Sequence, residues 1–226
     1  MEQIVTSLRK FKETRELKKL LARLDPSGKH ESNLAVQLLQ LYQEELIGRS
    51  EYLALRAKIA TGHYLSRLRS DCPELRGALY LYDTDKLRIW NASVSHMPDV
   101  FNEYTQGLDV GPDIPEQSPA PVYATHMLKI ENVLRSDHPI VSNHYDMYKR
   151  AAIQSFVTLP LVHGSESIGY QFISAERPRE FTAQELSRFS AASAYLIREL
   201  AAIKPYMIDQ FERAEPQAAH KHKKRP

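Results

Sequence analysis

The chain has 226 residues, of which 42% are hydrophobic and 26% charged, and its formal net charge is +2. This composition is that of a globular protein with a real core, and so small a net charge gives no general affinity for nucleic acid or membranes. The single cysteine, Cys72, excludes an internal disulfide and any site built from several cysteines. The N-terminus lacks the apolar stretch of a signal peptide, and no apolar run approaches the roughly 18 residues of a membrane helix. We therefore expect a soluble, cytoplasmic protein.

Residues 1–51 are predicted to form a helical extension. Apolar residues recur there at helical spacing, and an Asp-Pro-Ser-Gly sequence at 25–28 interrupts the pattern. The apolar stripe that follows continues to about Leu68. Gly48 and Gly62 interrupt this stripe, so it predicts either one kinked helix or two helices.

The pattern then changes to that of a β-hairpin. Residues 76–82 and 87–94 are rich in strand-forming residues, and the turn sequence at 83–86 separates them. A short helix is expected over 99–104. A proline-rich loop is expected over 107–121.

The following segment alternates short helices and strands. We expect a helix over 122–134, a strand over 139–142, a small helix or loop over 146–152, and strands over 155–162 and 167–175.

Specific residues mark the last elements. Pro160 removes a backbone donor from its strand, which suits a sheet edge or a bulge. Thr182 and Glu185 have the spacing of a capping box, which opens a helix that we expect to end near Ala202. Residues 203–226 are predicted to form a basic, disordered tail, in which the apolar period is lost after Phe211. The whole order predicts an α+β fold, an antiparallel sheet flanked by helices.

The second half of the chain carries a family resemblance in the order of its motifs. These motifs are a short strand at Pro139-Ile140-Val141, a strand ending in Leu159-Pro160-Leu161, a turn at Gly164, a strand opening with Ile168-Gly169, and a helix start from Phe181 to Leu186. Over residues 52–202 the chain resembles GAF domains. The resemblance implies a GAF/PAS-like antiparallel sheet flanked by helices and preceded by the N-terminal helical segment.

The resemblance also implies a small-molecule pocket between the sheet and residues 104–150. Aromatic and imidazole side chains there can stack on a planar ligand and hydrogen-bond its polar edge, although such residues are equally common in purely structural positions. The candidate ligand-binding residues are Tyr80, Trp90, Tyr123, His126, His144, Tyr145 and Tyr148. The chain departs from the family after Gly111, where prolines replace a glycine-rich stretch, and it lacks the motif of cyclic-nucleotide-binding members. The ligand and any cofactor stay unknown.

The usual signatures of catalysis are missing from the sequence. It contains no G-x-S-x-G elbow, no P-loop and no G-x-G-x-x-G. Cys72 precedes the first strand, away from the loop region where GAF relatives carry catalytic or bilin-linking cysteines, and alone it cannot complete a reductase cycle. Asp83 and Asp85 fit a hairpin turn better than a metal pair. No metal-ligand spacing is present, since His138 and His144 lie six apart, while a lone axial haem histidine is left open.

We therefore expect a non-enzymatic, stand-alone sensory GAF module that binds a small molecule. It would act as a homodimer through helices near 34–69 and 182–202. The alternative is a degenerate GAF fold that serves only as a protein-interaction or dimerisation platform, with its pocket filled by side chains such as Trp90 and Phe156. A GAF-type redox enzyme is a third reading, which the solitary cysteine disfavours. The first helix is basic, but no DNA-reading motif accompanies it, so nucleic acid is not an expected partner; a protein partner is compatible with the sequence.

Overall fold

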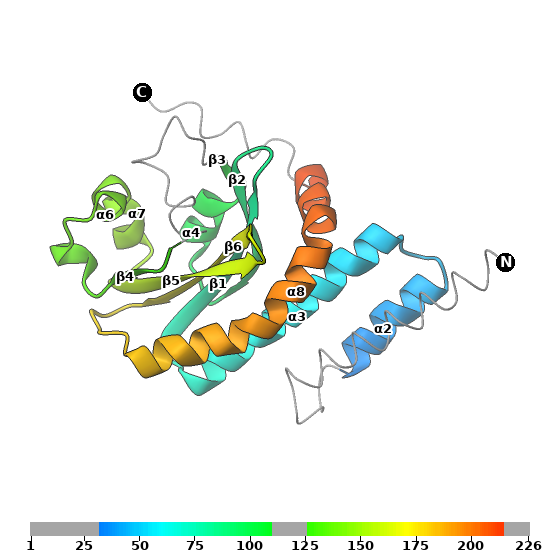
Figure 1. The fold of residues 1–226 in the computed structure, drawn as a ribbon, viewed down its shortest axis with the longest axis horizontal. Helices are drawn as coiled ribbons and strands as arrows, with labels where there is room; N and C mark the ends of the chain where they lie inside the picture. Colours follow the sequence, from blue (N-terminus) through cyan, green and yellow to red (C-terminus); the bar gives the residue numbers. More distant parts are fainter. Residues whose placement is uncertain (1–31, 110–125, 215–226) are drawn as a thin grey trace.

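A single six-stranded sheet forms the centre of the protein. The computed structural model describes residues 32–109 and 126–214 (Figure 1). The strands are β1 (Leu75–Asp83), β2 (Arg88–Ser95), β3 (Leu108–Asp109), β4 (Leu128–Ile130), β5 (Ser155–His163) and β6 (Glu166–Ala175). They lie in the order β3-β2-β1-β6-β5-β4, and every neighbouring pair is antiparallel.

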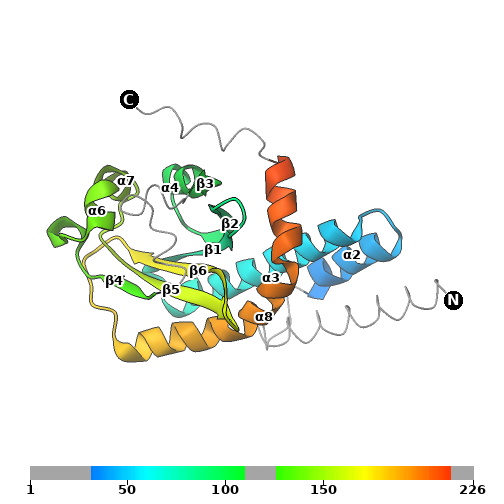
Figure 2. The same cartoon turned by 45° about the horizontal axis from the view of Figure 1, so that its top comes forward.

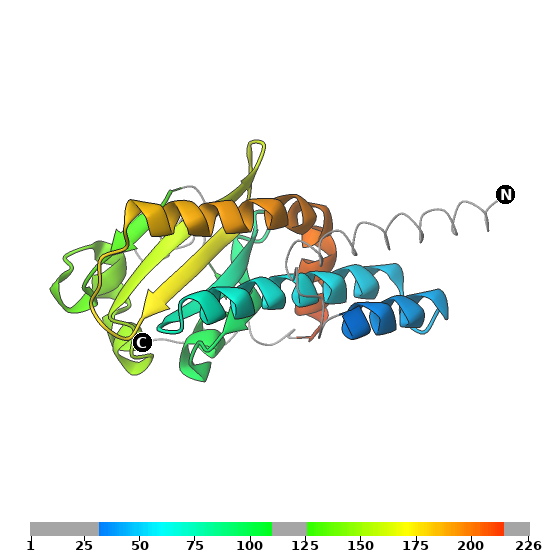
Figure 3. The same cartoon turned by 90° about the horizontal axis from the view of Figure 1, so that it is seen from below.

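Helices cover both faces of this sheet. They are α2 (Ser32–Gln43), α3 (Arg49–Asp71), α4 (Asp99–Thr105), α6 (Pro139–Asn143), α7 (Tyr145–Arg150) and α8 (Ala183–Ala214), with a 3-10 helix, η1, at Val133–Arg135. The long helices α3 and α8 run side by side under one face (Figure 3), and α4, α6 and α7 lie over the other (Figure 2). The predicted α+β fold is confirmed. Within the described ranges, none of the helices combines the length and apolar character needed to cross a bilayer.

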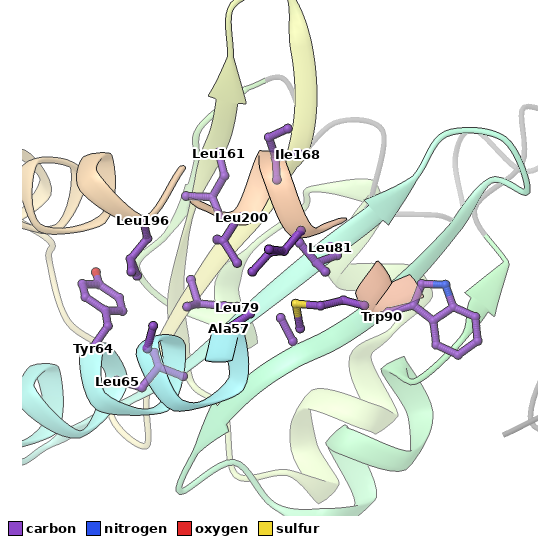
Figure 4. Packing of buried hydrophobic residues seen from close by; sticks show 14 of the residues in the cluster. Ala57, Tyr64, Leu65, Leu79, Leu81, Trp90, Leu161, Ile168, Leu196 and Leu200 are labelled. Atoms are coloured by element: carbon purple, nitrogen blue, oxygen red, sulfur yellow. The ribbon is translucent and has the colours of Figure 1, made fainter. Parts of the chain in front are cut away.

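Aliphatic side chains fill the space between the sheet and the α3–α8 pair (Figure 4). We call this cluster the helix-side core. Its buried members include Ala57, Leu65, Leu79, Leu81, Leu161, Ile168, Leu196 and Leu200. Leu79 and Leu81 belong to this core because alternate side chains of a strand point to the same face.

The predicted hairpin and capping box are both present. The Asp83 carboxylate accepts hydrogen bonds from the backbone N–H groups of Asp85 (3.0 Å) and Lys86 (3.2 Å), which closes the β1–β2 turn. Thr182 Oγ1 accepts from the Glu185 N–H (3.2 Å), and the Glu185 carboxylate accepts from the Thr182 N–H (3.0 Å). This reciprocal pair fixes the start of α8.

The N-terminal apolar stripe forms two helices, because the chain leaves helical geometry between Gln43 and Arg49. Gly48 precedes α3, whereas Gly62 lies inside it without ending it. Stacking of Tyr42 on Tyr52, with ring centroids 4.5 Å apart, attaches α2 to α3.

The last helix is longer than predicted. It continues past Ala202, where we expected it to end, and has Pro205 in its interior. After this proline α8 changes direction (orange to red in Figures 1 and 2). Ile203, Met207 and Phe211 explain the extension, because all three are buried in the helix-side core. The elements expected in 1–31, 110–125 and 215–226 lie outside the described residues.

Two predicted elements are wrong. The helix expected over 122–134 is, in its described part, the strand β4 followed by η1, because Leu128 to Ile130 pair with β5. The strand expected over 139–142 is the helix α6. Pro139 suits the first helical position, and the His138 ring accepts a hydrogen bond from the Ile140 N–H (3.3 Å) as its cap.

Pro160 lies where its strand is exposed at an edge. β4 pairs with β5 only over Phe156 to Thr158, so beyond that point no described strand flanks β5 on this side. A register shift follows between Leu161 and Val162. The expected edge position of this proline is confirmed.

Candidate functional site: a tyrosine-lined layer

The face of the sheet opposite α3 and α8 carries an aromatic cluster beneath α4, α6 and α7, which we call the aromatic layer. Its buried members are Ala78, Tyr80, Ile89, Met97, Phe101, Ile130, Val133, Ile140, Val141, Tyr148, Ala151, Ile153, Phe156, Tyr170 and Phe172. The rings of Phe101, Phe172, Phe156 and Tyr148 form a continuous series, with successive centroids 5.1 Å apart. Such offset contacts add to the stabilisation from burial.

Three tyrosine hydroxyls gather within this layer. Tyr80 and Tyr170 are paired across β1 and β6, and their rings stack with centroids 4.8 Å apart. Burial raises the pKa of both phenols, and the neighbouring Tyr148 raises each pKa further. The Tyr80 and Tyr170 hydroxyls are therefore neutral at physiological pH and can both donate and accept hydrogen bonds.

A polar chain leads from Tyr80 towards β2. The Tyr80 hydroxyl lies 3.3 Å from Thr105 Oγ1, which in turn lies 3.1 Å from Asn91 Oδ1 and 2.9 Å from the Phe101 carbonyl. Because Thr105 has one hydroxyl proton, it satisfies only one of these oxygens at a time. Tyr80, Thr105 and Asn91 thus form one connected polar group at the edge of the layer.

A second polar pair joins α4 to the α6–α7 junction. The Tyr104 hydroxyl lies 2.8 Å from His144 Nδ1, and the two rings meet edge-on. His144 is buried and Tyr104 half-buried. This contact holds the two helical segments together over the layer.

The structure brings only part of the predicted site together. Tyr80 and Tyr148 lie inside the aromatic layer, while Tyr145 packs against it and His144 closes its rim. His126 is exposed just before β4. Tyr123 lies outside the described residues.

Trp90 lies on the opposite face from Tyr80. It is the cross-strand partner of Leu81 and belongs to the helix-side core (Figure 4). Its ring stacks on that of Phe211, with centroids 6.0 Å apart. Its buried indole N–H has no hydrogen-bond partner within the described part of the chain. Grouping Trp90 with Tyr80 in one pocket was therefore wrong, as was expecting Trp90 to fill that pocket. Phe156, in contrast, lies in the middle of the layer.

Sequence reasoning missed Tyr104, Thr105 and Tyr170. Tyr170 could have been found from its alternation with Phe172 along β6, since alternate residues share a face. Nothing in the local sequence distinguishes Thr105, whose importance depends on where α4 packs.

The structure also locates the other reactive residues. Cys72 caps α3 and is half-buried; burial, followed by the nearby Glu74 carboxylate, raises the pKa of its thiol and keeps it protonated. Among residues 32–109 and 126–214, no group of three or more His, Cys, Asp or Glu side chains is placed to hold a metal ion.

Comparison with known proteins identifies the fold. No protein-family model matches the sequence, and no curated protein sequence matches it significantly. Solved structures do match. The chain is similar to a GAF domain/HD domain protein from Geobacter sulfurreducens, with a TM-score of 0.53 and 14% identity over 70% of this chain and 99% of that one.

Two further GAF domains show the same likeness. The PixJ GAF domain of Thermosynechococcus elongatus, in its blue-light-absorbing form, has a TM-score of 0.50 and 16% identity, over 75% of this chain and 96% of that one. The GAF domain of an Acinetobacter phosphoenolpyruvate-protein phosphotransferase has a TM-score of 0.50 and 13% identity, over 74% and 92% respectively. These structural matches show that the chain has a GAF-like fold.

Proposed function

We propose that this chain is a non-catalytic sensory and regulatory module, which binds a small, uncharged planar ligand at the aromatic layer and signals through its long helices. The observation that carries the proposal is the grouping of buried hydroxyls on one face of the sheet. Three tyrosines and Thr105 lie there, although an all-apolar layer would be simpler to stabilise, because each buried hydroxyl costs free energy unless it is hydrogen-bonded.

The chemistry of the layer defines the class of ligand. Neutral phenols and Asn91 offer donors and acceptors, and the surrounding rings offer stacking surfaces. The buried Lys, Arg, Asp and Glu residues in the described part of the chain lie elsewhere: Arg56 on α3, Asp83 at the end of β1 and Lys204 on α8. A buried charge without a partner is strongly unfavourable, so the layer suits an uncharged ligand.

The strands offer a route from this layer to the helices. On β1, Tyr80 faces the layer, whereas its neighbours Leu79 and Leu81 pack in the helix-side core with α3 and α8. A ligand that favours one position of Tyr80 therefore changes the packing of the helices. This is a shift between two packings, driven by the ligand's preference for one of them.

Self-association through the helices is part of the proposal. Leu41, Leu46 and Leu55 are large apolar residues exposed on α2, α3 and the turn between them, which supports a dimer interface at this end. The proposal also places the module in the cytoplasm, where a reducing environment keeps the single thiol free.

A second candidate function is a protein-interaction platform without a ligand. The stacked series from Phe101 to Tyr148 favours it, because these side chains already occupy much of the layer.

Thermal-shift measurements with a library of uncharged planar metabolites separate the two functions. We expect at least one compound to raise the melting temperature of the wild type, because a ligand that binds only the folded state stabilises it. We expect Tyr170→Phe to reduce this shift and Tyr206→Phe, whose side chain lies on α8, to leave it unchanged. If no compound stabilises the wild type while it still forms a dimer, the platform is the correct function.

A further inference from the structure

A cleft rich in arginine lies at one end of the sheet, away from the aromatic layer. It is formed where α3 ends, β1 begins and the β6–α8 loop starts (lower left in Figure 1), and its volume is about 800 Å³. Its charged lining residues are Arg69, Glu74, Arg76, Glu176, Arg177 and Arg179. We call it the arginine cleft. Four arginines against two glutamates give the lining a net charge of +2.

Two of the four guanidinium groups already have carboxylate partners. Arg76 is paired with Glu176, and it also donates a hydrogen bond to the Ala151 carbonyl at 2.8 Å. Arg179 is paired with Glu74 at 3.0 Å and with Glu185, the capping residue of α8. Both glutamates of the lining are therefore engaged.

The other two guanidinium groups lack a counter-charge. Arg69 donates to the Leu75 carbonyl (3.1 Å), and neither it nor the exposed Arg177 forms an ion pair with any residue in the described part of the chain. Arg69 also lies close enough to Arg76 to oppose its charge. Burial lowers the pKa of Arg76, and the positive charge of Arg69 lowers it further. An anion placed between these groups would relieve that repulsion.

The backbone around the cleft is held in place. The fully buried Ser155 donates its hydroxyl proton to the Arg177 carbonyl at 2.7 Å, and the Arg179 N–H donates to the Glu131 carbonyl at 3.0 Å. Pro178 stands between these two arginines and restricts their backbone further. Little ordering would be needed on binding, which favours affinity.

We propose that the arginine cleft binds the phosphate group of a small phosphomonoester. A phosphomonoester carries a charge of about −1.5 to −2 at neutral pH. The excess charge of the lining is opposite in sign, and it stays positive when Glu185, the second partner of Arg179, is counted. Planar guanidinium groups donate paired hydrogen bonds to phosphate oxygens, which an ammonium group cannot do in the same geometry. The volume also lies within the range of small-molecule sites. This site is additional to the aromatic layer and differs from it in ligand charge.

Calorimetric titration of the full chain tests the site, with inorganic phosphate and phenyl phosphate as probes at constant ionic strength. We expect Arg177→Ala and Arg69→Ala each to weaken phosphate binding about tenfold or more, the effect of losing a charge-assisted hydrogen bond. Arg135→Ala, which removes an exposed arginine outside the cleft, is the matched control and should bind like the wild type. The melting temperature of Arg177→Ala should match that of the wild type, because this exposed side chain forms no hydrogen bond or ion pair with residues 32–109 and 126–214.

Several results would overturn the proposal. One is phosphate binding that is equally strong in Arg177→Ala, Arg69→Ala and Arg135→Ala. Another is binding of acetate or chloride as tight as that of phosphate, which would indicate general charge screening. A third is that the wild type binds a polyglutamate peptide but neither inorganic phosphate nor phenyl phosphate. Tyr170→Phe changes the aromatic layer and should retain phosphate binding. The proposal for the arginine cleft can therefore be tested independently of the proposal for the aromatic layer.

Discussion

The two faces of the central sheet use the same strands for different purposes. The helix-side core is aliphatic, whereas the aromatic layer is rich in rings and hydroxyls. On β1 the difference alternates residue by residue, since Tyr80 stands between Leu79 and Leu81. Burial of aliphatic surface stabilises a fold by about 25 cal/mol per Å² without need of partners, whereas a buried hydroxyl requires one. The two faces therefore differ in chemistry, and our proposal assigns ligand binding to the aromatic layer and stabilisation of the fold to the helix-side core.

The largest expected effect comes from the backbone that both faces share. A Cβ atom on Gly169 would lie only 1.9 Å from the Tyr80 carbonyl oxygen, so Gly169→Ala forces β6 away from β1. We expect a loss of at least about 4 kcal/mol in the free energy of unfolding, measured by urea denaturation. Gly164→Ala is a useful comparison, because a Cβ there meets no atom within 4 Å and only its φ of +63° is unfavourable. Equal losses in the two variants would contradict the importance of the close strand approach.

The helix-side core should respond next most strongly. Leu65 is fully buried between α3 and the sheet, so Leu65→Ala should lower the free energy of unfolding by about 3 kcal/mol through lost burial and a cavity. Leu134→Ala, at a residue on η1 that is 60% exposed and lies outside the proposed dimer interface, should cost less than about 0.5 kcal/mol. Chemical denaturation of both variants measures the difference. A small effect at Leu65 would mean that this core is not what stabilises the fold.

Alkaline pH should act most strongly on the aromatic layer, where the two fully buried phenols lie. The folded-state pKa values of Tyr80 and Tyr170 are raised, so the stability from their neutral burial is present below about pH 10 and is lost as pH rises further. Each of the two groups should remove about 1.4 kcal/mol per pH unit until its folded pKa is reached. Unfolding free energies measured across this range provide the test. The double variant Tyr80→Phe/Tyr170→Phe should show a shallower loss, and an unchanged slope would contradict the assignment.

The smallest expected changes in the free energy of unfolding come from removing a single tyrosine hydroxyl on either face of the sheet. Tyr80→Phe should cost about 1 kcal/mol or less, because Thr105 keeps Asn91 and the Phe101 carbonyl as partners. Tyr64→Phe, on the helix side, should cost about 1–3 kcal/mol in the free energy of unfolding, because the buried Gln171 Nε2 donates to the Tyr64 hydroxyl and would lose this acceptor. The Gln171 Oε1 atom already has no partner in the described structure. Denaturation curves of the two variants give the order. A larger cost at Tyr80 would argue that its hydroxyl serves stability rather than recognition.

The parts of the fold that were predicted correctly depend on local signals. The turn at Asp83 and the capping box of Thr182 and Glu185 are formed by residues a few positions apart, so the sequence contains all of their chemistry. The strand β4 could not be predicted in this way, because its Leu128–Ile130 segment is short and is defined by pairing with a distant strand. Pairing across the fold overrode a pattern that also fits a helix.

The candidate site was predicted only in part, because its residues are also brought together by strand pairing rather than by local sequence. Aromatic residues near Tyr148 suggested a ring-lined layer, and Tyr80 and Tyr148 do lie in it. Trp90 was assigned to the wrong face because Ile89 and Trp90 are adjacent apolar residues, and only the strand register decides which of them points each way. The register shift between Leu79 and Tyr80 adds an irregularity that no sequence pattern reveals.

The proline inside α8 has a mechanical consequence. Pro205 cannot donate a backbone hydrogen bond to the preceding turn, so α8 consists of two helical segments joined at a weakened turn. The second segment contacts the sheet in two places. The Phe211 ring stacks on Trp90, and Lys86 Nζ in the β1–β2 turn pairs with Glu212 Oε1 at 2.6 Å. A torque applied at the end of α8 therefore acts on the β1–β2 hairpin through these contacts. It also acts directly on α3, because the Lys58 ammonium of α3 lies over the Phe211 ring, 5.1 Å from its centroid.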